Sequence, residues 1–213
     1  METLDQQPWW RSLRFSLRSL LALVLVIGGW LGWVVHRARV QREAVAAIER
    51  AGDKVWYDWE WNNGRPIPNG KPRCPKWLVD RIGVDYFGHV TSVYARHASD
   101  AELVHIGNLR QLECLILVGS FVTDAGLAHL EGVSSLQVLN LQRTRIADAG
   151  LPHLKKLTGL QELGLSDTGV SDAGIAHLEG LTHLTVLGLE KTKVTNVGVR
   201  ELQKVLTKAR IRR

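Results

Sequence analysis

Four histidines recur at one spacing, and they are the first candidates for chemistry in this sequence. His105, His129, His153 and His177 are each 24 residues apart. Imidazoles aligned in this way suggest a metal site or a pH sensor, because neutral imidazole binds metals and its protonation falls near neutral pH. Single histidines spaced 24 residues apart do not complete the coordination sphere of a metal ion, however, and no carboxylate recurs beside each one. We therefore expect the half-exposed flank of a repeated helix, with no metal and no cofactor.

No sequence motif for catalysis accompanies these histidines. The chain lacks Gly-x-Ser-x-Gly, His-Glu-x-x-His, Cys-x-x-Cys, a phosphate-binding loop and a dinucleotide fingerprint. Cys74 and Cys114 are 40 residues apart and match no metal or redox spacing, so free thiols are expected, with one disulfide as the alternative. The sequence predicts a protein that is not an enzyme, although a site assembled in space between distant segments stays open.

The same 24-residue interval governs the acidic and apolar residues. Asp124, Asp148 and Asp172 each begin an Asp-Ala-Gly triplet, and Asn196 takes the next position. Three series of leucines keep the period as well: Leu112, Leu136, Leu160 and Leu184; Leu115, Leu139, Leu163 and Leu187; and Leu117, Leu141, Leu165 and Leu189. A fixed period in this range indicates one supersecondary unit stacked on copies of itself.

Each unit has the pattern Leu-x-x-Leu-x-Leu-x-x-(polar)-x-Leu followed by a helix start such as Thr123-Asp124-Ala125-Gly126-Leu127. This resembles the leucine-rich repeat family, in the short bacterial variety whose helix begins Ser/Thr-Asp-Ala-Gly-Leu. The resemblance covers residues 88 to 213 and implies an α/β solenoid, with a short parallel sheet and helices on its convex side. The chain departs from the family at the polar position, where a hydroxyl replaces the usual Asn or Cys: Ser120, Thr144, Thr168 and Thr192. Gly132 and Gly180 are expected to end helices in the left-handed conformation.

In this family the exposed strand residues face the concave side, and the resemblance assigns the partner-binding surface to them. These residues are Cys114, Ile116, Val118, Val138, Asn140, Gln142, Glu162, Gly164, Ser166, Val186, Gly188 and Glu190. The first end of this surface is apolar and the later end is small and acidic, and Gly164 and Gly188 would let a partner backbone approach. Ile116, Val118 and Val138 either dock a partner or are covered by a preceding cap. Five strands would make a face ~20 Å wide.

An apolar segment near the N-terminus predicts a membrane helix. Residues 19–35 carry no charge, which at 1.5 Å per residue covers ~25 Å. Trp9 and Trp10 before this run and Trp30 and Trp33 near its end suit the two membrane interfaces. A cleaved signal peptide is the alternative. Basic residues flank both ends, so the sequence does not define the side of the membrane that carries the repeats.

Composition changes between the membrane segment and the repeats, since all eight tryptophans precede residue 78. We expect a helix over 40–50 with an apolar stripe of Ala44, Val45 and Ile48, an alternating strand over 55–61, a turn at Asn62-Asn63-Gly64 and a short helix over 75–82. The tryptophans are interpreted as a cap over the first repeat, with an aromatic recognition patch as the second hypothesis.

The predicted organisation is a tail (1–18), a transmembrane helix (19–36), a juxtamembrane helix and Trp-rich cap (37–87), leucine-rich repeats (88–207) and a basic cap strand (208–213). A net charge of +6 is modest, and the basic tail does not favour nucleic acid as a partner. The sequence therefore predicts a single-pass membrane protein that contacts lipid through residues 19–36 and binds an unidentified protein through its concave face. A structural envelope or scaffold protein without a specific ligand is the alternative.

Overall fold

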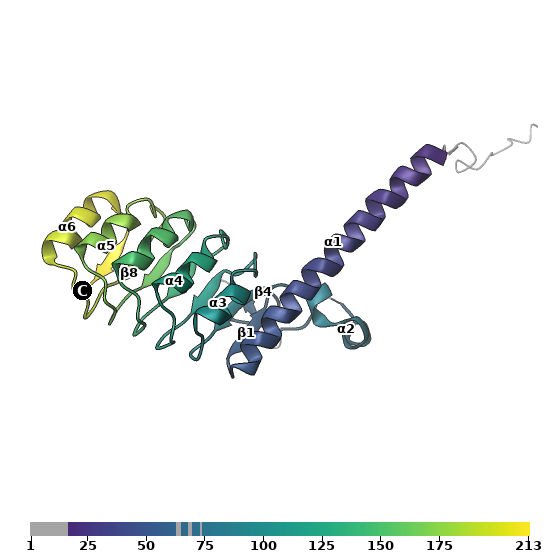
Figure 1. The fold of residues 1–213 in the computed structure, drawn as a ribbon, viewed down its shortest axis with the longest axis horizontal. Coiled ribbons are helices and arrows are strands. Elements are labelled where there is room, and N and C mark those ends of the chain that lie inside the picture. The colour runs from purple at the N-terminus through teal and green to yellow at the C-terminus, as the bar shows by residue number, and fades with distance from the viewer. Residues whose placement is uncertain (1–16, 63–64, 68–69, 73) are drawn as a thin grey trace, which may run out of the picture. The chain divides into compact units, whose positions relative to one another are not determined.

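The computed structural model describes residues 17–62, 65–67, 70–72 and 74–213. The chain forms two compact units, residues 1–38 and 39–213. The elements in chain order (Figure 1) are α1 (Leu17–Arg50), β1 (Lys54–Tyr57), β2 (Trp61–Asn62), β3 (Arg65–Pro66), α2 (Lys76–Ile82), η2 (Val84–Tyr86), β4 (Val90–Tyr94), α3 (Asp100–Ile106), β5 (Cys114–Ile116), α4 (Asp124–Leu127), η3 (Ala128–Leu130), β6 (Val138–Asn140), η4 (Asp148–Lys156), β7 (Glu162–Gly164), α5 (Asp172–Ile175), η5 (Ala176–Leu178), β8 (Val186–Gly188), α6 (Asn196–Val205) and β9 (Arg210–Arg212).

The helix α1 is long and apolar enough to cross a membrane or to act as a signal sequence. Its span Ser19–Arg50 has 32 residues and a mean hydropathy of 2.0 in its most apolar window, and it is the one such helix among the described residues. Its last turns belong to the second unit, where Ala44, Val45 and Ile48 are buried as the predicted stripe requires. The predicted tail, with Trp9 and Trp10, lies outside the described residues apart from its last two positions.

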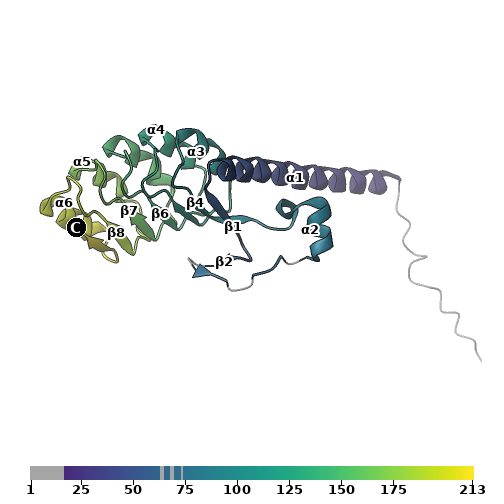
Figure 2. The ribbon, with the colours of Figure 1, turned by 90° about the horizontal axis from the view of Figure 1, so that it is seen from below.

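The second unit is built on one seven-stranded sheet in the order β1-β4-β5-β6-β7-β8-β9. Strand β1 is antiparallel to β4, and every later pair is parallel. The helices α3 to α6 follow one side of this sheet (Figure 2). The expected width from five strands was too small, because β1 and β9 extend the sheet at both ends. Six interstrand spacings of ~4.8 Å give a face of ~29 Å.

The period produces a continuous core because parallel pairing matches residues 24 positions apart. Leu115 pairs with Leu139, Leu139 with Leu163, and Leu163 with Leu187, and all four are at most 1% exposed. The helical side adds leucines such as Leu127 and Leu151, which are also fully buried. Burial of one such side chain stabilises the fold by ~1.5–3 kcal/mol, so the repeated leucines supply the main favourable term. The three leucine phases are therefore explained by stacking.

The aspartate of each triplet binds the next repeat. Asp148 Oδ1 accepts a hydrogen bond from Ser171 N at 2.7 Å, and its Oδ2 accepts one from Ser171 Oγ at 2.5 Å. Asp172 binds Thr195 in the same way, and so does Asp100, 24 residues before the first triplet, with Thr123. Asp124 receives only the Ala147 amide, because alanine has no hydroxyl. Each aspartate therefore joins consecutive repeats at the N-terminal ends of their helices.

Three of the four hydroxyl side chains at the polar position form hydrogen bonds within their own repeat, whereas Ser120 Oγ is buried and has no hydrogen-bond partner among the described residues. Thr144 Oγ1 donates to Leu141 O at 2.6 Å, and Thr168 Oγ1 donates to Leu165 O at the same distance. Thr192 repeats the contact with Leu189 O at 2.7 Å. These hydroxyls cap carbonyl groups locally where the chain leaves each strand. This explains why threonine suffices here without a longer amide side chain.

Within the repeats, the left-handed residues lie in the turns after the strands, and the prediction for Gly132 and Gly180 is wrong. Positive φ occurs at Gly119 (72°) and at three other residues in its repeat position, Arg143 (56°), Asp167 (58°) and Lys191 (56°). Gly132 and Gly180 are not among the described glycines with positive φ. The helices end instead in tight 3₁₀ turns such as η3 and η5, which need no left-handed residue.

The Trp-rich segment forms a shorter strand than the alternation over 55–61 predicts. Strand β1 ends at Tyr57, and a turn closed by Glu60 N donating to Tyr57 O at 2.9 Å precedes β2. The turn lets Trp59 leave the strand line, where it is buried and stacks on Tyr57 at 4.9 Å between ring centroids. Residues 63 and 64 of the predicted turn lie outside the described residues. The short helix predicted over 75–82 is α2.

Candidate protein-interaction surface

Strand register arranges the predicted concave residues into rows. Cys114 pairs with Val138, Val138 with Glu162, and Glu162 with Val186. A second row follows the same strands two residues later: Ile116, Asn140, Gly164 and Gly188. The remaining four residues continue the alternation just beyond the strand ends: Val118, Gln142, Ser166 and Glu190. All twelve therefore belong to one sheet face, opposite the leucines that fill the core.

Both rows extend onto β1, β4 and β9, whose residues were not among the twelve predicted for this face. Trp56 pairs with Ser92 and Ser92 with Cys114, while Lys54 pairs with Tyr94 and Tyr94 with Ile116. At the other end Val186 pairs with Arg210 and Gly188 with Arg212. The alternation of Arg210 and Arg212 around Ile211 was a signal that these two face outward. The pairing of β1 with β4 left no comparable signal, because β1 is not a repeat.

The apolar end of the face keeps part of its surface accessible. Ile116, Val118 and Val138 are half-buried, whereas Cys114 is 6% exposed. Burial, followed by the nearby Glu162 and Glu113, raises the pKa of the Cys114 thiol to about 11. The thiol is therefore protonated at neutral pH and is a small apolar group in this surface, since the thiolate is the reactive form.

A hollow of about 160 Å³ lies over strands β6 to β8. Eight of the twelve predicted residues line it: Val138, Asn140, Gln142, Glu162, Gly164, Val186, Gly188 and Glu190. Arg212 of β9 also contributes to its lining. The structure thus brings together the predicted residues of the small and acidic end, together with a basic side chain from the next strand.

The glycines of this hollow make room for neighbouring side chains of the protein itself. A Cβ at Gly164 would lie 2.8 Å from Asn140 Oδ1, and one at Gly188 would lie 3.1 Å from Ser166 Oγ. Asn140 is held over Gly164 because its Oδ1 also accepts from Gln142 N at 3.1 Å. These glycines therefore have an internal role as well, and the close approach of a partner backbone to them stays a prediction.

Glu190 is held as a carboxylate at this end of the face. The Ser166 hydroxyl donates to its Oε2. This hydrogen bond, a backbone hydrogen bond and the charge of Arg212 hold the pKa of Glu190 below its usual range. Glu162, two rows away on β7, is exposed. The hollow therefore presents fixed negative charge over β7 and β8, which suits a basic group on a partner.

The recurring histidines lie on the helical side and are not brought together with the concave residues. His153 Nδ1 is 2.7 Å from Glu131 Oε1, and Lys156 Nζ is 2.7 Å from Glu131 Oε2. His105 and His129 are exposed and His177 is half-buried. Within the part of the chain that the structure describes, no group of three or more His, Cys, Asp and Glu side chains could hold a metal ion.

No family model matches the sequence, and no curated protein sequence matches it either. Among solved structures, the chain is similar to the leucine-rich repeat ectodomain of the receptor kinase SOBIR1 from Arabidopsis thaliana. The TM-score is 0.50 and the identity 16%, over 81% of this chain and 90% of that one. This likeness, together with the parallel sheet and its helices, defines the fold as an α/β leucine-rich repeat fold.

Two other solved structures share less of their length with this chain. An internalin from Listeria monocytogenes is 25% identical with a TM-score of 0.46, over 51% of this chain and 30% of the internalin. A leucine-rich repeat protein from Leptospira interrogans is 21% identical with a TM-score of 0.43, over 52% of this chain and 27% of that protein. The chain therefore spans less than a third of the length of either protein.

Proposed function

We propose that this chain is a membrane-anchored, non-catalytic module that binds a protein partner through its concave sheet face. The proposal rests on a difference between the core positions of the repeats and the concave positions. The leucines, aspartates and triplet glycines keep their type because stacking requires it, while the concave residues change from repeat to repeat. A surface that varies along a rigid scaffold is a suitable place for partner specificity.

The side chains of the concave face suit a partner that carries both apolar and basic residues. Half-buried Ile116, Val118 and Val138 offer apolar contact, and Glu162 and Glu190 offer negative charge. The face of ~29 Å is wide enough for a segment of about eight extended residues laid across the strands. Such a contact is small beside a standard protein interface of ~800 Å² per partner, so membrane clustering would add avidity.

The proposed organisation keeps residues 1–18 as a tail, 19–36 as the membrane helix, 37–87 as juxtamembrane helix and cap, 88–207 as short bacterial-type repeats and 208–213 as a basic cap strand. The apolar and exposed character of α1 from Leu20 to Ile27 supports the anchor. Comparing the N-terminal residue of the mature membrane-bound protein with the start of the sequence tests it. A protein that keeps residues 19–36 fits an anchor, and one that starts after them fits a cleaved signal.

The concave face is tested by Ile116→Glu in the full-length protein. Introducing a charge at a half-buried face residue should leave the fold intact and weaken partner capture by at least about tenfold, since apolar contact area is lost. The matched control is Val104→Glu, which places the same charge at an exposed apolar residue of α3. Capture that falls equally in both variants, or in neither, contradicts the proposal and favours a scaffold role. Circular dichroism of both variants checks that the repeats remain folded.

A further inference from the structure

A larger hollow lies at the N-terminal edge of the sheet, where β1 pairs with β4. Its volume is about 460 Å³, and its lining includes Asp53, Lys54, Trp56, Tyr94, Arg96 and His97. Lys54 and Trp56 are two residues apart on β1 and so share one face of the strand. Their register partners, Tyr94 and Ser92, are in turn paired with Ile116 and Cys114. The hollow is therefore continuous with the apolar end of the concave face.

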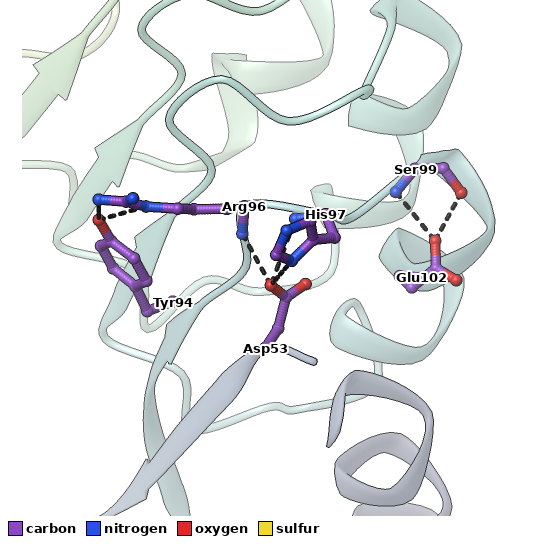
Figure 3. Close-up of polar contacts among 6 residues, drawn as sticks. All are labelled: Asp53, Tyr94, Arg96, His97, Ser99 and Glu102. Carbon is purple, nitrogen blue, oxygen red and sulfur yellow. Dashed lines mark hydrogen bonds and ion pairs between the residues drawn. The ribbon is translucent and has the colours of Figure 1, made fainter. Parts of the chain in front are cut away.

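Asp53 builds this hollow by tying the segment after β4 to the start of β1. Its Oδ1 accepts from Arg96 N at 3.0 Å and from His97 N at 3.2 Å, and it lies 3.0 Å from His97 Nδ1 (Figure 3). The next turn is fixed by a capping box, in which Glu102 Oε2 accepts from Ser99 N at 2.9 Å. Because the Asp53 side chain is only 3% exposed, its carboxylate is not accessible to a binding partner.

Cationic side chains remain accessible at the rim. Arg96 donates through Nε at 2.9 Å and Nη2 at 2.6 Å to the Tyr94 hydroxyl (Figure 3). This contact holds an exposed guanidinium beside the Tyr94 ring, and Lys54 is exposed on the neighbouring strand. The lining thus combines two aromatic side chains, Trp56 and Tyr94, with accessible positive charge. Aromatic walls favour a flat apolar group, and the cations favour an adjacent anion.

We propose that this hollow anchors an aromatic side chain that stands next to a carboxylate in the peptide segment bound by the concave face. The inference rests on the proposed function and specifies the sequence of residue types along the partner segment. From the hollow to Glu162 on β7 is ~17 Å, or three and a half strand spacings, which an extended chain covers in about five residues. The partner segment therefore carries an acidic-aromatic pair at one end, an apolar residue over Ile116, and a basic residue about five positions from the aromatic one.

The probe is a fluorescein-labelled peptide of sequence Glu-Phe-Ser-Val-Ser-Ser-Lys, tested beside its reversed sequence by fluorescence anisotropy against the full-length protein in detergent. Two substituted probes, Gln-Phe-Ser-Val-Ser-Ser-Lys and Glu-Ala-Ser-Val-Ser-Ser-Lys, remove the charge and the ring. We expect the parent peptide, in one of its two directions, to bind more tightly than both. Equal affinity of the parent and the substituted probes, or no saturable binding below ~1 mM, overturns the proposal.

Protein variants identify the site. Arg96→Gln should lower the affinity for the parent probe by about two- to fivefold, because an exposed charge pair contributes little to binding. It should leave the affinity for the Gln-Phe probe unchanged. Trp56→Leu should weaken both the parent and Gln-Phe probes by about tenfold through lost aromatic contact. The control is Arg145→Gln, an exposed arginine in the turn after β6. Should Trp56→Leu fail to fold, the charge-specific effect of Arg96→Gln alone decides the matter.

The outcomes separate this inference from the proposed function. If Ile116→Glu abolishes partner capture while Arg96→Gln and Trp56→Leu leave probe binding unchanged, the hollow is not an anchor and the concave face still is an interaction surface. If Arg96→Gln and Trp56→Leu lower the affinity for the probe while Ile116→Glu leaves partner capture unchanged, the hollow binds acidic-aromatic groups. In that case the proposed function of the concave face is wrong. Weakening by both sets of variants supports both.

Discussion

At the scale of single residues, the triplet glycines are required by the close approach of the preceding repeat. A Cβ at Gly174 would lie 2.2 Å from Asp148 Oδ1 and 3.0 Å from Leu151 Cδ1. Gly126, Gly150 and Gly198 meet the preceding aspartate at 2.2 to 2.5 Å in the same way. The Asp-Ala-Gly triplet therefore works across repeats. Its aspartate reaches forward to the next repeat, and its glycine admits the aspartate of the repeat before.

Gly174→Ala should lower the free energy of unfolding by about 1–3 kcal/mol, because the added methyl displaces Asp148 from Ser171. The matched control is Gly180→Ala, where an added Cβ meets nothing within 4 Å and φ is not positive. That variant should be neutral or stabilising by up to about 1 kcal/mol. Thermal unfolding followed by circular dichroism measures both. Equal destabilisation by the two alanines would show that the Asp148 contact does not matter.

At the scale of the elements, the helix starts are not equivalent in the inter-repeat hydrogen bonds they make. Three of the four aspartates receive both an amide and a hydroxyl, from Thr123, Ser171 and Thr195. The fourth, Asp124, receives the amide of Ala147 alone at 2.8 Å. The junction that begins η4 is thus the one with a missing donor among the described Asp-to-helix junctions.

Ala147→Ser should restore this donor and stabilise the protein by about 0.5–1.5 kcal/mol, the usual net contribution of one hydrogen bond. The reason is geometric, since Ser171 occupies the equivalent position and donates to Asp148 Oδ2. Ser171→Ala is the complementary control and should lose a similar amount. A rise in unfolding temperature for the first variant and a fall for the second are expected. No change in either would contradict the account of the junctions.

The repeated elements could be predicted from the sequence, whereas their ends and connections could not. Leucine spacing fixed the core positions Leu115, Leu139 and Leu163, because burial enforces residue type. The left-handed turns at Arg143 and Lys191 carry no sequence signature, because among the four positions this conformation favours only the residue types of Gly119 and, less strongly, Asp167. The position of Trp59 and the pairing of β1 with β4 depend on tertiary packing, which the local alternation does not encode.

The sequence predicted the residues of the candidate surface on β5 to β8 but not those on the outer strands β1, β4 and β9. The twelve predicted residues lie on one sheet face because the repeat period sets their phase. Trp56 and Tyr94 were not assigned to the face, since β1 joins the sheet antiparallel and outside the period. The hollow that contains them is formed by Asp53 contacts between segments more than forty residues apart, and no short-range pattern predicts such contacts.

At the scale of the whole molecule, several carboxylates join neighbouring repeats or turns and make stability depend on pH. Hydrogen bonds from Thr195 lower the pKa of Asp172, those from Ser166 lower the pKa of Glu190, and those from Ser99 lower the pKa of Glu102. Because these pKa values are lower in the folded chain, their contribution is fully present above the ordinary carboxyl pKa of about 4. It is lost as the pH falls through the folded-state values.

The free energy of unfolding should therefore be nearly constant from pH 7 to about 5 and decrease as the pH falls further. Urea unfolding at several pH values measures this change. Thr195→Val, which removes the hydroxyl donor to Asp172, should flatten the decrease slightly, because the pKa of Asp172 then moves toward its ordinary value. Stability that rises on acidification would contradict the assigned directions.

Binding of a protein partner by the concave face can be tested by photocrosslinking in the native membrane. A photoreactive amino acid is placed at Asn140, on the concave face, and separately at Lys155, which is exposed on the helical side. We expect a discrete crosslinked partner from position 140, which disappears in the Ile116→Glu background, and none from position 155. Crosslinks from position 155 alone, or the same products from both positions, would contradict it.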